Sequence, residues 1–109
     1  MRPLSRKLEL EALNRTDNGS GGFDSAWVSL GVHWGAVDPG RGRLETGDGH
    51  ARSRTSSRIT IRAVPPTSPS RPVAGQRFRD GTRVFLIRAV ADAPDARHLI
   101  CYTDEEDAS

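Results

Sequence analysis

The chain has 109 residues, of which 35% are hydrophobic and 28% are charged, and its formal net charge is +2. This apolar share is low for a globular chain, so we expect a thin core that partner subunits complete. The single cysteine, Cys101, excludes an internal disulfide and a cysteine-rich zinc site, and it indicates synthesis in a reducing compartment such as the bacterial cytoplasm. Because Met1–Leu13 alternates polar and apolar residues and the apolar runs are short, neither a signal peptide nor a membrane span is expected.

Charge is distributed unevenly along the chain. Lys7 is the only lysine, so arginine supplies almost all of the positive charge, and its guanidinium group suits phosphate and carboxylate partners. The stretch from Arg41 to Arg62 is strongly basic, whereas the chain becomes acidic from Asp92 and ends in an acidic tail, residues 104–109. For that tail, simple solvation is the plainest explanation.

Two strands are predicted in the first third of the chain. Lys7–Leu13 alternates with period two, which is typical of a half-buried strand, and Asn14–Gly22 has the composition of a turn. Ala26–Val37 predicts a second, longer strand that its glycines bend. We expect one face of this second strand to point inward, with Val28, Leu30, Val32, Trp34 and Ala36.

The next segment, Gly40–Ser57, has no usable periodicity and is rich in Gly, Ser, Thr and Arg. We therefore expect a long loop over residues 39–58. A loop of this length inside a compact domain is usually functional or disordered, so this segment is the most suggestive one for function.

The remaining residues predict four further strands. Arg58–Val64 alternates, a proline-rich connector spans residues 65–72, and Asp80-Gly81 is a hairpin signal. The last three strands are expected at Gln76–Arg79, Thr82–Ala91 and Arg97–Thr103, with residues 104–109 frayed.

Six short strands with no helical period predict one all-β domain over residues 1–109, a small six-stranded barrel or sandwich with the long loop between strands 2 and 3. The predicted inward set is Leu8, Leu10, Val28, Leu30, Val32, Ile59, Ile61, Phe85 and Ile87.

Catalytic and metal-binding motifs are not found, and no cofactor is expected. His33, His50 and His98 lack ligand-like neighbours at short spacing, so each is interpreted as a structural or surface histidine. Cys101 lies between Ile100 and Tyr102 and is interpreted as a small buried hydrophobe. Both tryptophans are interpreted as core residues, although Trp27 also fits a contact between subunits.

The order of these features resembles the phage head–tail joining family, also called head closure or stopper proteins. The matching residues are Gly21-Gly22, Trp27-Val28, Trp34-Gly35-Ala36, Ile61-Arg62, Arg77-Phe78, Gly81, Phe85, Ile87, Val90 and Arg97–Cys101. The chain departs from the pattern at Gly35, where the family often has alanine, at Phe78, where a β-branched residue is common, and in its long connector and acidic tail. Its arginine-rich composition resembles the versions found in gene transfer agents.

The resemblance implies a structural virion protein at the head–tail junction, not an enzyme. It implies a hexameric ring below the portal and its adaptor ring, with a tail terminator or tail tube docked beneath. It also implies that the loop over residues 39–58 faces a DNA channel and contacts packaged DNA without sequence specificity. The residues expected to do so are Arg41, Arg43, Arg52, Arg54 and Arg58.

Two other functions stay open at this stage. The first is a neighbouring ring protein, either the largely helical adaptor or the tail terminator, in which a helix packs on a sheet; the sequence shows no helical pattern. The second is a small nucleic-acid-binding β-barrel, which would place stacking aromatics among its basic residues. Here the aromatics lie on apolar strand faces instead.

Overall fold

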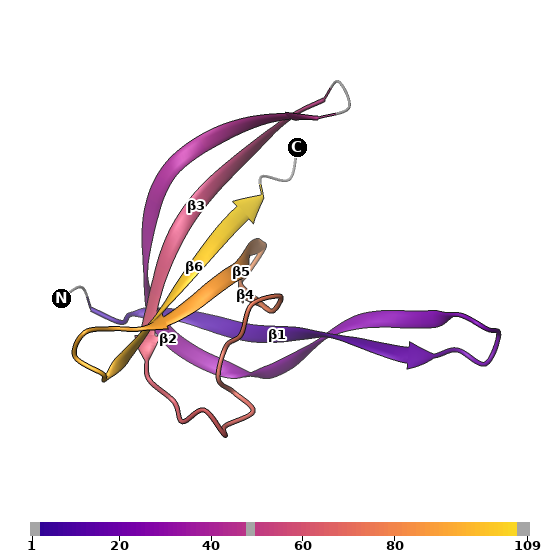
Figure 1. Ribbon diagram of the computed structural model, residues 1–109, viewed down its shortest axis with the longest axis horizontal. Coiled ribbons are helices and arrows are strands. Elements are labelled where there is room, and N and C mark those ends of the chain that lie inside the picture. The colour runs from indigo at the N-terminus through magenta and orange to yellow at the C-terminus, as the bar shows by residue number, and fades with distance from the viewer. Residues whose placement is uncertain (1–2, 48–49, 107–109) are drawn as a thin grey trace.

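The fold consists of β-strands alone within the described residues. The computed structural model describes the backbone of residues 3–47 and 50–106, and the side chains of residues 3–40 and 55–105. The strands are β1 (Arg6–Asp17), β2 (Phe23–Gly47), β3 (His50–Arg62), β4 (Arg77–Asp80), β5 (Arg83–Asp92) and β6 (His98–Glu106) (Figure 1). The all-β prediction is therefore confirmed, and the described part contains no helix that could cross a membrane.

All six strands belong to one antiparallel sheet that closes in a ring in the order β1-β2-β3-β6-β5-β4. The closing contact is short, because β4 pairs with β1 only from Glu9 to Glu11. Arg6 of β1 and Asp80 of β4 make an ion pair beside this contact. Closure pairs the two outer strands of the sheet over this short stretch, which shortens the edge that another chain could pair with.

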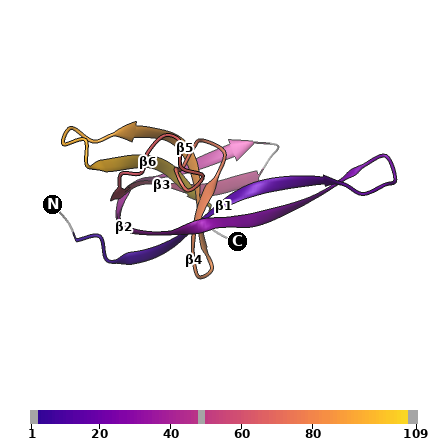
Figure 2. The same ribbon diagram turned by 90° about the horizontal axis from the view of Figure 1, so that it is seen from below.

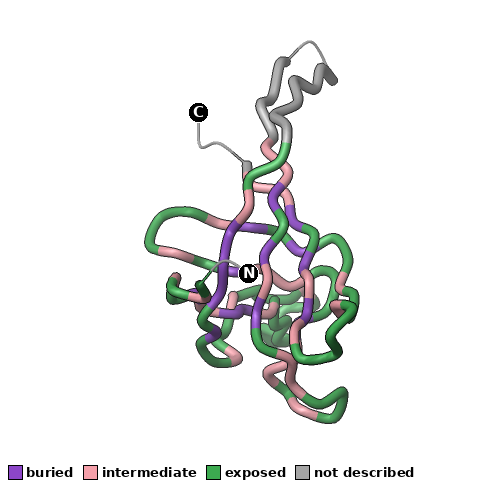
Figure 3. Tube along the Cα trace, turned by 90° about the vertical axis from the view of Figure 1, so that its left-hand side faces the viewer, coloured by how far each residue is buried: buried purple, intermediate pink, exposed green. Residues whose placement is uncertain are grey.

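The core lies inside the closed sheet, where most of the buried segments gather (Figure 3). Six members of the predicted inward set are buried there, which confirms the assignments for β1, β3 and β5: Leu8, Leu10, Ile59, Ile61, Phe85 and Ile87. Val37 of β2, Phe78 of β4, and Leu99 and Cys101 of β6 complete the cluster. The alternation of apolar and polar residues in these strands is visible in the sequence because one face of each strand is buried and the other is exposed to solvent.

The predicted inward face of β2 is wrong for the residues before Gly35, whereas Ala36 of the same predicted face is buried at 7%. Val28, Val32 and Trp34 are 38%, 46% and 55% exposed, whereas His33 is buried at 8%. Leu30 is only partly buried against the core. Trp34 is therefore a surface residue rather than the core residue that its apolar neighbours indicated.

A β-bulge at Gly31 causes this reversal. The register between β1 and β2 shifts after Leu10, which pairs with Gly31, while Glu11 pairs with Ser29. Gly31 adopts a φ of 122°, which a residue with a side chain rarely does. The extra residue exchanges the two faces of β2, so that positions 31, 33 and 35 rather than 30, 32 and 34 lie opposite the buried face of β1.

Two hairpins extend beyond the closed sheet as arms (Figure 1). After Glu11, β1 pairs only with β2, and this ladder continues to Asp17 opposite Phe23. We call residues 12–28 the β1–β2 arm. On the other side, β2 and β3 remain paired from Pro39 to Gly47 opposite His50, and we call residues 39–58 the β2–β3 arm.

The arms correct three boundaries predicted from the sequence. The loop expected over residues 39–58 is a paired hairpin, and residues Asn14–Asp17, expected in a turn, belong to β1. The tail expected to fray is strand up to Glu106, because Asp104 to Glu106 pair with β3; residues 107–109 lie outside the described part. A two-stranded ribbon buries neither face, so its sequence has no apolar alternation to detect.

The proline-rich connector between β3 and β4 is held to the sheet by specific contacts. His33 Nε2 donates to the carbonyl oxygen of Ser70 at 2.7 Å, and its ring stands edge-on to Phe78 at a centroid distance of 6.0 Å. Arg71 Nη1 donates to the carbonyl oxygen of Val64 at 3.0 Å. These contacts give the buried His33 a structural role in holding the connector to the sheet.

Candidate functional site

The predicted arginines converge on one element, the β2–β3 arm. The backbone register places Arg43 opposite Arg54 and Glu45 opposite Arg52, and Arg41 falls in the irregular step between Pro39 and Gly42. The side chains of Arg41, Arg43, Arg52 and Arg54 lie outside the described residues. Their sequence positions nevertheless gather four arginines on a hairpin that projects from the closed sheet (Figure 1).

Arg58, the fifth predicted arginine, is exposed at the base of this arm. It lines a depression of about 550 Å³ that also includes Arg88 from β5 and Tyr102 from β6. Arg88 Nη1 lies 3.4 Å from an oxygen of Asp104, which keeps this second cation over the sheet. The base of the arm is therefore polar and mixed in charge rather than a closed cavity for a small ligand.

Arg88 and Tyr102 are members of this surface that sequence reasoning missed. Tyr102 is the Cα partner of Arg58 across the β3–β6 ladder, and Arg88 falls at the irregular step between Ile87 and Ala89. Their proximity follows from two separate strand pairings, because β6 pairs with β3 on one side and with β5 on the other. The alternation of apolar and polar residues within each strand does not predict which residues of different strands pair.

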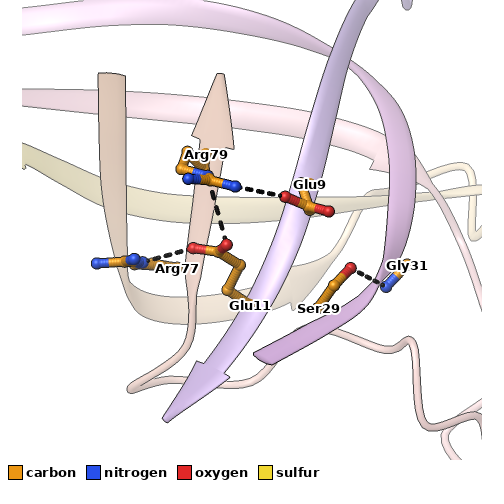
Figure 4. A network of polar contacts seen from close by, with 6 residues as sticks. All are labelled: Glu9, Glu11, Ser29, Gly31, Arg77 and Arg79. Carbon is orange, nitrogen blue, oxygen red and sulfur yellow. Dashed lines mark hydrogen bonds and ion pairs between the residues drawn. The ribbon is translucent and has the colours of Figure 1, made fainter. Parts of the chain in front are cut away.

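A second polar cluster fixes the root of the β1–β2 arm (Figure 4). Glu11, only 5% exposed, accepts from Arg77 Nε at 2.8 Å and lies 3.4 Å from Arg79 Nε. Arg79 also donates to Glu9 at 3.0 Å, and this hydrogen bond lowers the pKa of Glu9. A buried carboxylate needs such partners, so the cluster ties β4 to β1 where the arm leaves the sheet.

Trp27 joins this cluster from the arm itself. The guanidinium carbon of Arg77 lies 4.0 Å from the centroid of the Trp27 ring, close enough for a cation–π contact. Arg77 thus bridges Glu11 and Trp27, which explains why this tryptophan is half-buried although it stands on an arm. The arm leaves the closed sheet in a defined direction rather than on a flexible joint.

The described residues hold no group of His, Cys, Asp and Glu side chains that could bind a metal ion. His98 Nδ1 lies 2.8 Å from Asp95 in an exposed turn, and the side chain of His50 lies outside the described part. Burial raises the pKa of the Cys101 thiol to about 12, so this cysteine is an inert core residue. The surfaces offered by this chain are arms and strand faces, which are suited to contacts with macromolecules.

These features define a structural protein whose surfaces serve contact with other macromolecules, and the comparisons with known proteins agree. The profile of the phage head completion protein family matches residues 2–107, almost the whole chain. The chain therefore belongs to the phage head completion protein family. This is a structural family and not an enzyme family, so the chain is a structural virion component of the phage head–tail type.

The solved structures contain a close relative in fold and sequence. A chain from the structure titled "Virion of native gene transfer agent (GTA) particle" superimposes with a TM-score of 0.86 and 34% sequence identity, and the alignment covers 100% of both chains. The search of curated protein sequences gave no match. The resemblance inferred from the sequence is confirmed by the family profile and by this structure.

Proposed function

We propose that copies of this chain form a ring, hexameric in the simplest case, at the head–tail junction of a phage or phage-like particle. The ring lies below the portal and its adaptor ring, closes the DNA-filled head, and gives the tail terminator or tail tube its docking surface. Family membership and the similarity to a chain of a gene transfer agent virion support this assignment.

The observation that carries the proposal furthest is the composition of the β2–β3 arm. It contains five arginines against Glu45 and Asp48, a formal charge of 5 − 2 = +3, on a hairpin that extends past the closed sheet. In a ring, every copy contributes the same arm, so the charges form repeated positive rings around the axis. Such rings attract phosphate without reading base sequence, as a channel for packaged DNA requires.

Replacing Arg41, Arg43, Arg52 and Arg54 with serine tests this role in assembled particles. We expect the closed sheet to fold, because the core formed by the described residues comes from other positions. Filled heads should lose DNA or fail to keep tails, which lowers delivery by at least about tenfold.

A matched control replaces the same four arginines with lysine. Because a non-specific phosphate contact depends on charge, the lysine variant should deliver DNA close to the normal level. If the serine variant keeps its DNA and delivers it normally, the β2–β3 arm has no role in the channel. The ring itself would then need separate support from particle images.

A further inference from the structure

One face of the β1–β2 arm is only partly covered by other described residues. Leu13 pairs with Trp27 and Asp17 with Phe23, so these residues share one side of the ribbon. Leu13 is 45% exposed and Phe23 is 67% exposed, while Trp27 is covered by Arg77. A two-stranded hairpin is only marginally stable in water by itself, so an arm that exposes large apolar residues near its tip points to a binding partner.

A matching apolar groove lies on the opposite part of the molecule. It has a volume of about 450 Å³ and is lined by Leu4, Val32, Trp34 and Val64, together with His33, Ala63 and Arg62. Val32 and Trp34 are the two residues that the Gly31 bulge turns outward. The bulge therefore places two large apolar side chains of β2 on the surface instead of in the core.

The charges around the two surfaces are complementary. Asp17 and Asp24 flank Phe23 near the tip of the arm, and both are exposed. Arg62 lines the groove, and Lys7 is the cross-strand partner of Trp34 at its rim. Asp17, which shares the Phe23 side of the ribbon, and Arg62 make no ion pair within the described part of the chain, so both charges are available to a partner.

One copy cannot join its own arm to its own groove. Lys7, at the groove, and Asp17, near the tip, are ten positions apart on the same strand, which corresponds to about 33 Å. Figure 2 shows the tip of the arm and the N-terminal end of β1 on opposite sides of the closed sheet. The partner of the arm must therefore be another molecule.

We infer that the β1–β2 arm of one copy docks its Phe23 side into the Leu4–Val32–Trp34–Val64 groove of the next copy. Donor and acceptor are different surfaces of the same chain, so the contact is head-to-tail and repeats from copy to copy. Such a contact generates a ring when the rotation closes. The inference rests on the proposed ring function and specifies which surfaces hold the ring together.

Disulfide trapping in assembled particles tests this contact, with Phe23→Cys and Val32→Cys combined in one chain. Cys101 can stay in place, because it is fully buried and its pKa is about 12. Oxidation should give a ladder of covalently linked copies up to the full ring. Each single variant should give no ladder beyond a dimer.

A charge exchange checks the same contact without cysteines. Asp17→Arg and Arg62→Asp should each lower incorporation into particles about tenfold, and the double variant should recover it, because the exchanged charges again attract. Both positions are exposed, so the fold should not depend on them.

The possible results separate the inference from the proposed function. Particles that contain the chain and retain DNA, but give neither a ladder nor charge recovery, would overturn the arm contact and leave the ring function intact. Absence of the unmodified chain from the head–tail junction would overturn both. A ladder in the double cysteine variant, with recovery in the charge exchange, supports both.

Discussion

Gly35 shows how a single residue sets the packing inside the closed sheet. A Cβ at this position would lie 3.0 Å from Leu8 Cδ1, 3.0 Å from the carbonyl oxygen of Thr60 and 3.1 Å from Ile61 Cγ2. Two of these atoms belong to fully buried side chains and the third to the backbone of a paired strand. Leu8 and Ile61 therefore occupy the space that a side chain on β2 would take.

Gly35→Ala should accordingly destabilise the fold by about 1–3 kcal/mol, the usual cost of adding a methyl group to a packed core. Urea unfolding followed by tryptophan fluorescence measures this cost. Gly22→Ala is the matched control, because its new Cβ would meet only the side chain of Asn18 at 3.3 Å. Equal stability of the two variants would show that the interior around Leu8 is looser than the structure indicates.

At the scale of the strand, the acidic end of β6 shows how an ion pair holds the end of a strand in place. Glu105 accepts two hydrogen bonds from Arg83, from Nε at 2.7 Å and Nη2 at 2.8 Å. The hydrogen bonds from Arg83 lower the pKa of Glu105 below its ordinary value of 4.5. The sequence indicated a solvated tail because acidic residues at a chain end rarely find a fixed partner, and the partner lies 22 residues earlier on β5.

This ion pair gives a pH dependence with a defined sign. Because the folded pKa of Glu105 is depressed, the pair stabilises the fold above about pH 4.5, and this contribution is lost as the pH falls through the folded value. Arg83→Gln should lower stability by no more than about 1 kcal/mol at pH 7, since Arg83 is partly exposed and screened. The difference from the unmodified chain should be smaller at about pH 3 than at pH 7, because protonation of Glu105 weakens the pair.

Urea midpoints at the two pH values measure the effect, with Arg97→Gln as the control, because the Arg97 side chain is exposed and has no ion pair in the described residues. A constant difference between the Arg83 variant and the unmodified chain at both pH values would argue against this ion pair.

The strands also show where sequence patterns are informative. β1, β3 and β5 bury one face, and their inward residues, such as Leu8, Ile59 and Phe85, follow from alternation alone. In β2 the bulge at Gly31 reverses the alternation, so the apolar residues Val32 and Trp34 lie on the exposed face rather than in the core. The arms were missed because a projecting ribbon is held by backbone pairing, which leaves no apolar period.

One part of the candidate site can be predicted from the sequence composition, and the other part is visible only in the structure. The clustering of arginines over residues 39–58 is visible in the sequence, and so is the lack of catalytic motifs. The placement of Arg88 and Tyr102 beside Arg58 depends on the β3–β6 and β5–β6 registers. The bridge from Glu11 through Arg77 to Trp27 likewise joins three strands that are distant in sequence.

At the scale of the whole molecule, a small closed sheet carries two long hairpins in different directions. The molecule measures 48 × 36 × 22 Å, an elongated shape for so short a chain, and its core involves few residues. In the proposed ring, the β1–β2 arm connects neighbouring copies while the β2–β3 arm carries arginine to the channel. The low apolar content of the chain fits a protein that completes its burial in an assembly.

An image of the assembled head–tail junction, resolved well enough to trace strands, tests the central claim most directly. The account predicts a ring of identical copies in which every β2–β3 arm, residues 39–58, points toward the axis beside the DNA. A ring whose β2–β3 arms point outward, away from the DNA, or a junction in which the chain forms no ring, would contradict it.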